Sequence, residues 1–223
     1  MRQLVVYKTD EGIEECIIPG YRITVRPVID RSLTGDYIYD VDISIAHYKY
    51  NTDDGKTDLK YDIGLLKLIS PLPIPTTTTT SSGGQSYLSP AVNGICLPDK
   101  DIVNTEDELA LNAGFGYIDE SVVNYGPLMM EWIIIKKAFN TTRDGWDNWI
   151  RSYRYPHYTG SGICKGDSGG PVVQYVGDRA VLIGITSASS LNVHCLAYNP
   201  NAIMIFIRVS RFVDWIVDTI ENN

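Results

Sequence analysis

The chain contains 223 residues, 44% of them hydrophobic and 21% charged, and carries a formal net charge of −8 at pH 7. This length and composition are typical of one sizeable globular domain or two small ones. The negative charge argues against a nucleic-acid partner and against an anionic membrane surface, and no apolar run approaches the roughly 18 residues that a membrane-spanning helix needs.

Short strands are predicted along the first half of the chain. Leu4–Val6 is a candidate strand, and its apolar core is too short for a signal peptide. Tyr21–Arg26 and Val41–Ala46 alternate between apolar and polar residues, as half-buried strands do. Ile63–Ile69 is mostly apolar and stops before Pro71, which is typical of a buried strand.

The segment from Pro75 to Tyr87 contains five consecutive threonines together with serines and glycines. This composition predicts a surface loop, because it offers nothing to bury, and gives no reason to place a domain boundary there. Strand candidates resume beyond the loop, and they predict an all-β fold. They are Asn112–Tyr117, Trp132–Ile135, Val172–Val173, Val181–Ile185 and Met204–Ile207.

The end of the chain changes period and predicts an amphipathic helix. Ser210 is the expected N-cap, and Asp214 in the first turn complements the helix dipole. The apolar residues fall at the spacing of one helix face. They are Phe212, Trp215, Ile216 and Ile220.

Four cysteines occur in the chain, Cys16, Cys96, Cys164 and Cys195. They form no CxxC pair and have no histidines at zinc-site spacing, so no metal site is expected. Two disulfides, or one disulfide with two free thiols, are both open, and either implies an oxidising compartment. The sequon Asn140-Thr141-Thr142 is consistent with secretion.

The most specific pattern is the run Gly166-Asp167-Ser168-Gly169-Gly170-Pro171. Glycines around the serine allow backbone angles that other residues avoid. Such a turn can present a hydroxyl and direct successive N–H groups at one point, and acyl transfer requires that combination. A glycine-rich hairpin with an incidental serine is the simpler alternative.

This run resembles the nucleophile motif of the chymotrypsin-like serine proteases. Other segments resemble that family in the same order, between about residues 16 and 220, with Phe115 in place of the family's usual Trp. These segments are His47–Asn51, Tyr61–Leu68, Ile95–Pro98, Ala113–Gly116, Gly184–Ser187, and Ile207–Ser210 with Trp215-Ile216. The resemblance implies one protease domain over residues 1–220, built from two six-stranded antiparallel β-barrels, the first of them incomplete, and a C-terminal α-helix.

The implied parts are 1–98 for the first barrel and its connection, 99–209 for the second barrel and 210–221 for the helix. The active site is expected in the cleft between the barrels. The resemblance also implies a disulfide between Cys164 and Cys195 that braces the substrate pocket. It assigns no pairing to the other two cysteines.

By the same resemblance, Ser168 is the nucleophile, and the N–H groups of Gly166 and Ser168 form the oxyanion hole. Asp62 is the buried carboxylate that orients the catalytic base. Asp167 is implied to pair with a newly cut N-terminus when a zymogen is activated. No cofactor is expected.

The resemblance places Gly162 at the floor of the substrate pocket, and Ser187, Ala188 and Ser189 along its wall. The family's usual wall is Ser-Trp-Gly, so an apolar ring is lost and a side chain is added. An uncharged pocket cannot pair a buried cation. Specificity for Arg or Lys is therefore not expected.

The base that should activate Ser168 is missing from its expected place. The family takes it from a Thr-Ala-Ala-His-Cys block ahead of the Asp, where Glu15 and Cys16 stand in this chain. A glutamate has an unperturbed pKa of about 4.3 and is a weak base for a serine proton.

His47 is the tempting substitute, but it lies only 15 residues before Asp62, too close for the family's spacing. It fits a solvated hairpin better. His157, in a polar loop, and His194, beside Cys195, are expected to be structural.

Together these features imply a secreted, monomeric member of the serine endopeptidase family that acts on a protein or peptide. Two hypotheses stay open. In one, the chain is an incomplete form of an active protease. In the other, it is a pseudoprotease that binds a partner or substrate without cutting it.

Overall fold

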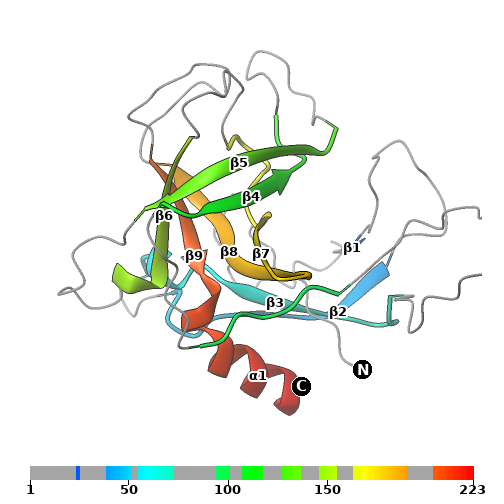
Figure 1. The fold of residues 1–223 in the computed structure, drawn as a ribbon. Coiled ribbons are helices and arrows are strands. Elements are labelled where there is room, and N and C mark those ends of the chain that lie inside the picture. Colours follow the sequence, from blue (N-terminus) through cyan, green and yellow to red (C-terminus); the bar gives the residue numbers. More distant parts are fainter. Residues whose placement is uncertain are drawn as a thin grey trace, which may run out of the picture.

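A computed structural model of the chain describes residues 24–25, 39–51, 55–72, 94–100, 107–117, 127–136, 146–154, 163–189 and 203–223. Its strands form one three-stranded sheet and one closed barrel (Figure 1). The sheet has the antiparallel order β1-β2-β3, and its strands are β1 (Thr24–Val25), β2 (Tyr39–Ala46) and β3 (Gly64–Leu68).

The barrel follows the order β4-β5-β6-β9-β8-β7 and closes where β4 pairs with β7. Its strands are β4 (Leu109–Gly114), β5 (Met129–Lys136), β6 (Trp149–Arg154), β7 (Pro171–Val176), β8 (Arg179–Ser189) and β9 (Met204–Arg208). The remaining described elements are the short 3₁₀ turns η1 (Leu59–Tyr61), η2 (Trp146–Asn148) and η3 (Val209–Arg211), and the helix α1 (Val213–Asn222).

The fold is therefore mostly β with a C-terminal helix, as predicted, and one six-stranded barrel is present in closed form. The described residues of the first half give three strands and not a second closed barrel. The expected strand at Leu4–Val6 and the threonine-rich segment lie outside the described residues.

Strand β6 was not predicted from the sequence. Its interior positions are Ile150 and Ser152, both fully buried. The Ser152 hydroxyl donates a 2.8 Å hydrogen bond to the carbonyl of Ile134 on β5, which satisfies its polar atom inside the barrel. A serine at an interior position conceals the alternation by which a strand is recognised.

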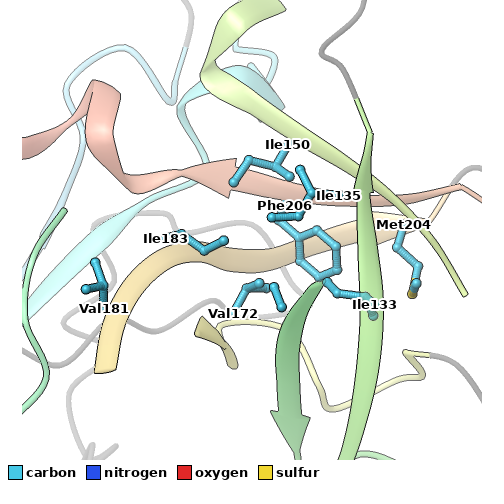
Figure 2. Close-up of a cluster of buried hydrophobic side chains, with 9 residues drawn as sticks. Ile133, Ile135, Ile150, Val172, Val181, Ile183, Met204 and Phe206 are labelled. Carbon is cyan, nitrogen blue, oxygen red and sulfur yellow. The ribbon is translucent and has the colours of Figure 1, made fainter. Parts of the chain in front are cut away.

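The barrel interior is filled by one cluster of side chains (Figure 2). Phe206 is the largest of the side chains that are fully buried, and Figure 2 shows it among residues from β5, β6, β7 and β8. The cluster consists of Ala110, Ile133, Ile135, Ile150, Val172, Val181, Ile183, Met204 and Phe206.

A second apolar cluster joins the sheet, the barrel and the helix. Ile63, which precedes β3, and Leu65, which lies in it, pack with Ile207 of β9 and with Ile216 of α1. The helix therefore covers the junction between the two halves (Figure 1). Burial of its apolar face holds it there, and this stabilises a short helix more than its intrinsic propensity does.

The predicted N-cap of the helix is wrong by two residues. Ser210 lies within η3, is buried, and its hydroxyl has no hydrogen-bond partner. The chain makes this 3₁₀ turn before the helix begins, so Phe212 takes the N-cap position and its N–H donates to the carbonyl of Val209. Asp214 lies in the first turn, as predicted.

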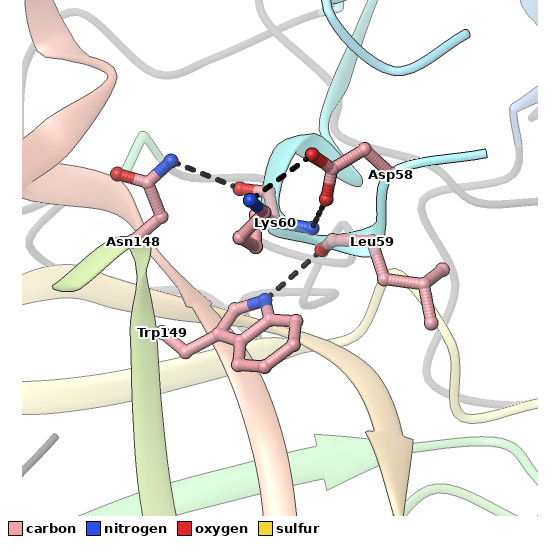
Figure 3. A network of polar contacts seen from close by, with 5 residues as sticks. All are labelled: Asp58, Leu59, Lys60, Asn148 and Trp149. Carbon is pink, nitrogen blue, oxygen red and sulfur yellow. Dashed lines mark hydrogen bonds and ion pairs between the residues drawn. The ribbon is translucent and has the colours of Figure 1, made fainter. Parts of the chain in front are cut away.

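Polar contacts fasten η1 of the first half to the barrel (Figure 3). The Trp149 indole N–H donates to the carbonyl of Leu59 at 3.0 Å, and the Asn148 amide donates to the carbonyl of Lys60 at 3.1 Å. On the other side of the turn, the Asp58 carboxylate accepts the N–H of Lys60 at 3.0 Å. The turn that leads into Asp62 is thus closed by a contact of its own and held to the barrel by two others.

Candidate active site

Ser168 lies in a tight loop between the turn at Cys164 and the start of β7. Gly166 and Gly169 have φ angles of 92° and 80°, a region that favours glycine. The Asp167 N–H donates to the carbonyl of Cys164, and the Gly170 N–H donates to the carbonyl of Asp167. The glycines of the motif therefore serve the backbone path of this loop, as the sequence predicted.

Two N–H groups of the loop remain unengaged. Within the described part of the chain, the N–H groups of Gly166 and Ser168 donate no hydrogen bond, whereas those of Asp167, Gly169 and Gly170 all do. The Ser168 hydroxyl likewise makes no hydrogen bond with these residues, and its side chain is partly exposed. A hydroxyl and two donors of one short loop are thus available to a ligand.

Asp62 follows η1 and is buried, with 6% of its surface exposed. Its carboxylate accepts a 2.6 Å hydrogen bond from the hydroxyl of Ser187, which is also buried. Burial of a carboxylate is costly unless such partners are present. The sequence interpretation placed Ser187 only along the substrate pocket and missed this contact, because the two residues lie 125 positions apart.

Strand β8 brings Asp62 and the serine loop to the same place. The residue before Ser187 is Thr186, whose carbonyl accepts the Gly169 N–H and whose N–H donates to the carbonyl of Gly170. The Thr186 hydroxyl accepts a 3.0 Å hydrogen bond from the Asn112 amide inside the barrel. One strand therefore anchors the loop of Ser168 and, at the next residue, Asp62.

Asp167 points its carboxylate back toward β4. One oxygen accepts the N–H of Gly116 at 2.7 Å and the other accepts the N–H of Cys164 at 2.8 Å. Burial raises the pKa of the Asp167 carboxyl, and the hydrogen bonds from Cys164 and Gly116 oppose this rise. No cation pairs with Asp167 among the described residues.

His47 is buried and not solvated, contrary to the sequence interpretation. Its ring stacks on Tyr48 and Tyr61, with centroid distances of 4.6 Å and 5.1 Å, and it contacts Phe212 and Trp215 at the start of α1. The physical reason is that aromatic residues near it in the sequence and others near the C-terminus together enclose the ring.

The Nδ1 atom of His47 accepts the N–H of Lys49 at 3.2 Å. Burial and then the charge of Lys49 lower the pKa of His47 to about 4. The structure shows no hydrogen bond from His47 to Asp62 or to Ser168, all three of which are described. This histidine is therefore placed as part of the aromatic cluster.

Tyr50 is a further residue of this region that the sequence interpretation did not single out. It is buried, and burial together with the negative charge of Asp62 raises the pKa of its hydroxyl. Its N–H donates to the carbonyl of His47, and its carbonyl accepts the N–H of Asp58. Tyr50 therefore belongs to the packing that surrounds the buried carboxylate.

The structure describes some of the remaining predicted site residues and not others. Ala188 and Ser189 lie at the end of β8, opposite Ile205 and Met204 of β9. Cys96 is an exposed free thiol, which is incompatible with two disulfides. Several predicted residues lie outside the described ranges, namely Glu15, Cys16, His157, Gly162, His194 and Cys195.

The described residues contain no cluster of three or more side chains suited to hold a metal ion. In the same ranges, no helix has both the length and the apolar composition to cross a membrane.

The chain matches a known protein family over most of its length. A sequence profile described as Trypsin matches residues 21–216, most of the chain. The matched region includes β1 to β9, the Ser168 loop and Asp62. The chain therefore belongs to the trypsin family of serine proteases.

Proposed function

We propose that this chain carries the nucleophile, the oxyanion-binding groups and the orienting carboxylate of a serine endopeptidase, and that as written it does not turn over peptides. Ser168 is the nucleophile, the N–H groups of Gly166 and Ser168 bind the oxyanion, and Asp62 is the carboxylate. The observation that carries the proposal is the assembly of the Ser168 loop and Asp62 on the adjacent residues Thr186 and Ser187.

In the proposed chemistry, the Ser168 oxygen attacks the scissile carbonyl carbon and a base removes the hydroxyl proton. The carbonyl oxygen, now an oxyanion, accepts hydrogen bonds from the two loop N–H groups. The base then passes its proton to the leaving amine, and water hydrolyses the acyl ester. Each step except the oxyanion contact depends on the base.

The expected inactivity of the chain is argued from the base, which the described residues do not supply. A serine hydroxyl needs a base within about 2.6–3.2 Å to become a good nucleophile. His47 is the one histidine in the described residues, and its ring nitrogen Nδ1 is engaged by Lys49. Its low pKa would also make it a poor proton acceptor.

A fluorophosphonate probe tests this proposal, because its reaction needs both an activated serine and oxyanion donors. We expect no labelling of the 223-residue chain at Ser168. A form extended upstream to include a Thr-Ala-Ala-His-Cys-like block should label and should cleave peptides after uncharged residues. The Ser168→Ala variant of the extended form is the matched control and should do neither.

A second candidate function, binding without cleavage, is favoured by Ala188 and Ser189, which replace the family's aromatic wall. If the extended form also stays unlabelled, this pseudoprotease function is the correct one. Stoichiometric labelling of the 223-residue chain would instead overturn the argument from the missing base and identify another side chain in that role.

A further inference from the structure

The loop that carries Ser168 packs against the end of β4 and the residues that follow it, 113–117. Besides the two hydrogen bonds accepted by Asp167, the Tyr117 N–H donates to the carbonyl of Lys165 at 2.9 Å. Gly170 approaches the carbonyl of Ala113 so closely that a Cβ there would lie 2.6 Å from its oxygen. The loop and the end of β4 therefore meet at several points, from residue 165 to residue 170.

Two glycines make room for the Asp167 carboxylate. A Cβ at Gly116 would lie 2.5 Å from the carboxylate carbon of Asp167, and a Cβ at Gly114 would also overlap the carboxylate. Real Cβ atoms do not approach other atoms so closely, so a side chain at either position would displace Asp167. Each carboxylate oxygen meanwhile accepts one hydrogen bond from a backbone N–H group of the chain itself.

We infer that Gly114 and Gly116 are positioning residues that hold the Ser168 loop through Asp167, so that the loop is ordered in the uncut chain without an ammonium group from a cleaved N-terminus. This differs from the role that the family resemblance implied for Asp167. The inference concerns the order of the loop, and it rests on the proposed function only where that order serves the oxyanion-binding groups.

The two hydrogen bonds accepted by the Asp167 carboxylate explain how this side chain holds the loop. They tie Asp167 to a residue before it and to a residue beyond β4, so the side chain fixes the loop at its centre. The neighbouring residues are Gly166 and Ser168, whose N–H groups are unengaged among the described residues. A loop held at Asp167 keeps those two donors on either side of a fixed point.

Amide hydrogen exchange of the full, uncut chain tests this inference and does not depend on catalysis. We expect slow exchange at the N–H groups of Gly116, Cys164 and Asp167. Addition of the free dipeptide Ile-Val at millimolar concentration, as a source of a hydrophobic ammonium, should change these rates less than about twofold. Rapid exchange in the uncut chain, slowed about tenfold or more by the dipeptide, would overturn the inference.

Variants test the glycine cradle. Asp167→Ala should speed exchange in the loop by about tenfold or more, because a hydrogen bond to a charged group is worth at least that factor. Gly116→Ala should do the same although it leaves the carboxylate in place, and the double variant should add little to either. Gly94→Ala, at a position with open space around it, is the matched control and should leave the loop unchanged.

Exchange at the N–H of Ile216, which donates to the carbonyl of Phe212 in α1, reports whether each variant is folded. If Gly116→Ala leaves the loop as protected as in the natural chain, the glycine cradle is not what positions Asp167. Should a variant fail to fold, the dipeptide measurement on the natural chain still decides the question. Failure of the fluorophosphonate experiment, by contrast, would bear on the proposed function and not on the order of the loop.

Discussion

The Ser187 hydroxyl donates a 2.6 Å hydrogen bond to the Asp62 carboxylate, and through it the closed barrel contacts the segment between η1 and β3 at a buried point. Ser187 and Asp62 are only 4% and 6% exposed. Since water does not reach this pair freely, the hydrogen bond cannot be replaced by solvent at little cost. The contact is therefore both a structural link and a determinant of where the carboxylate lies.

Ser187→Ala should destabilise the protein by about 1.5–3 kcal/mol, because a buried carboxylate loses a donor. Urea unfolding at pH 7 measures the change. In an Asp62→Asn background the same substitution should cost less, since the partner is no longer charged. Ser168→Ala, which removes a partly exposed hydroxyl that makes no hydrogen bond with the described residues, is the control and should stay within about 0.5 kcal/mol. Equal losses at the two serines would contradict the assigned contact.

His47 should make the stability of the protein depend on pH. Its pKa is about 4 in the folded chain and 6.5 in its ordinary state, so between these values the unfolded chain binds a proton that the folded chain does not. Stability from this residue is therefore complete above about pH 6.5, falls as the pH falls toward 4, and changes no further below that. The full effect is on the order of 3 kcal/mol.

The measurement is urea unfolding at pH 7 and pH 4.5 for the natural chain and for His47→Phe. Phenylalanine keeps a ring in the stack with Tyr48 and Tyr61 but does not titrate. The variant should lose stability at pH 7, where the acceptor for the Lys49 N–H is missing. It should also show a smaller loss between the two pH values. An unchanged difference between pH 7 and pH 4.5 would refute the assignment.

Phe206→Ala should cost about 3–5 kcal/mol, because it empties part of the barrel interior. Phe206 is fully buried among the side chains of Figure 2. Met130→Ala offers a comparison on the same barrel at a position that is 61% exposed, and it should change stability by no more than about 0.5 kcal/mol. Thermal and urea unfolding of both variants would reveal whether the barrel interior is the main apolar core.

Cys164 and Cys195 are predicted to form a disulfide that stabilises the chain by about 2–4 kcal/mol. Alkylation without reduction, followed by peptide mapping, distinguishes the states of the cysteines. Cys96, which is free and exposed, should take the label. The peptides of Cys164 and Cys195 should be recovered linked, and an alkylated Cys164 would exclude the pairing.

Sequence patterns predicted those strands whose burial alternates or whose residues are mostly apolar. β2, β3 and β9 follow such patterns closely. β6 was missed because Ser152 occupies an interior position. The prediction for β8 was six residues too short, two at its start and four at its end, where Thr186, Ser187 and Ser189 are polar. Thr186 is buried by its contact with Asn112, which a pattern along one strand cannot reveal.

In the candidate site, too, local features could be predicted from the sequence and contacts between distant residues could not. The Ser168 loop was predictable because its need for glycine is local and is written into six consecutive residues. The contact of Ser187 with Asp62 and the burial of His47 depend on elements far apart in the chain. In the case of His47, the enclosing residues Phe212 and Trp215 come from the opposite end of the chain.

The barrel and the first half of the chain are joined by hydrogen bonds next to Asp62. Trp149 donates to the carbonyl of Leu59, and Asn148 donates to the carbonyl of Lys60. The apolar cluster around Ile207 and α1 lies at the same junction. Separating the two halves would expose this cluster and release the turn before Asp62. We therefore expect the barrel and the turn before Asp62 to unfold together, so that the carboxylate loses its place only when the barrel does.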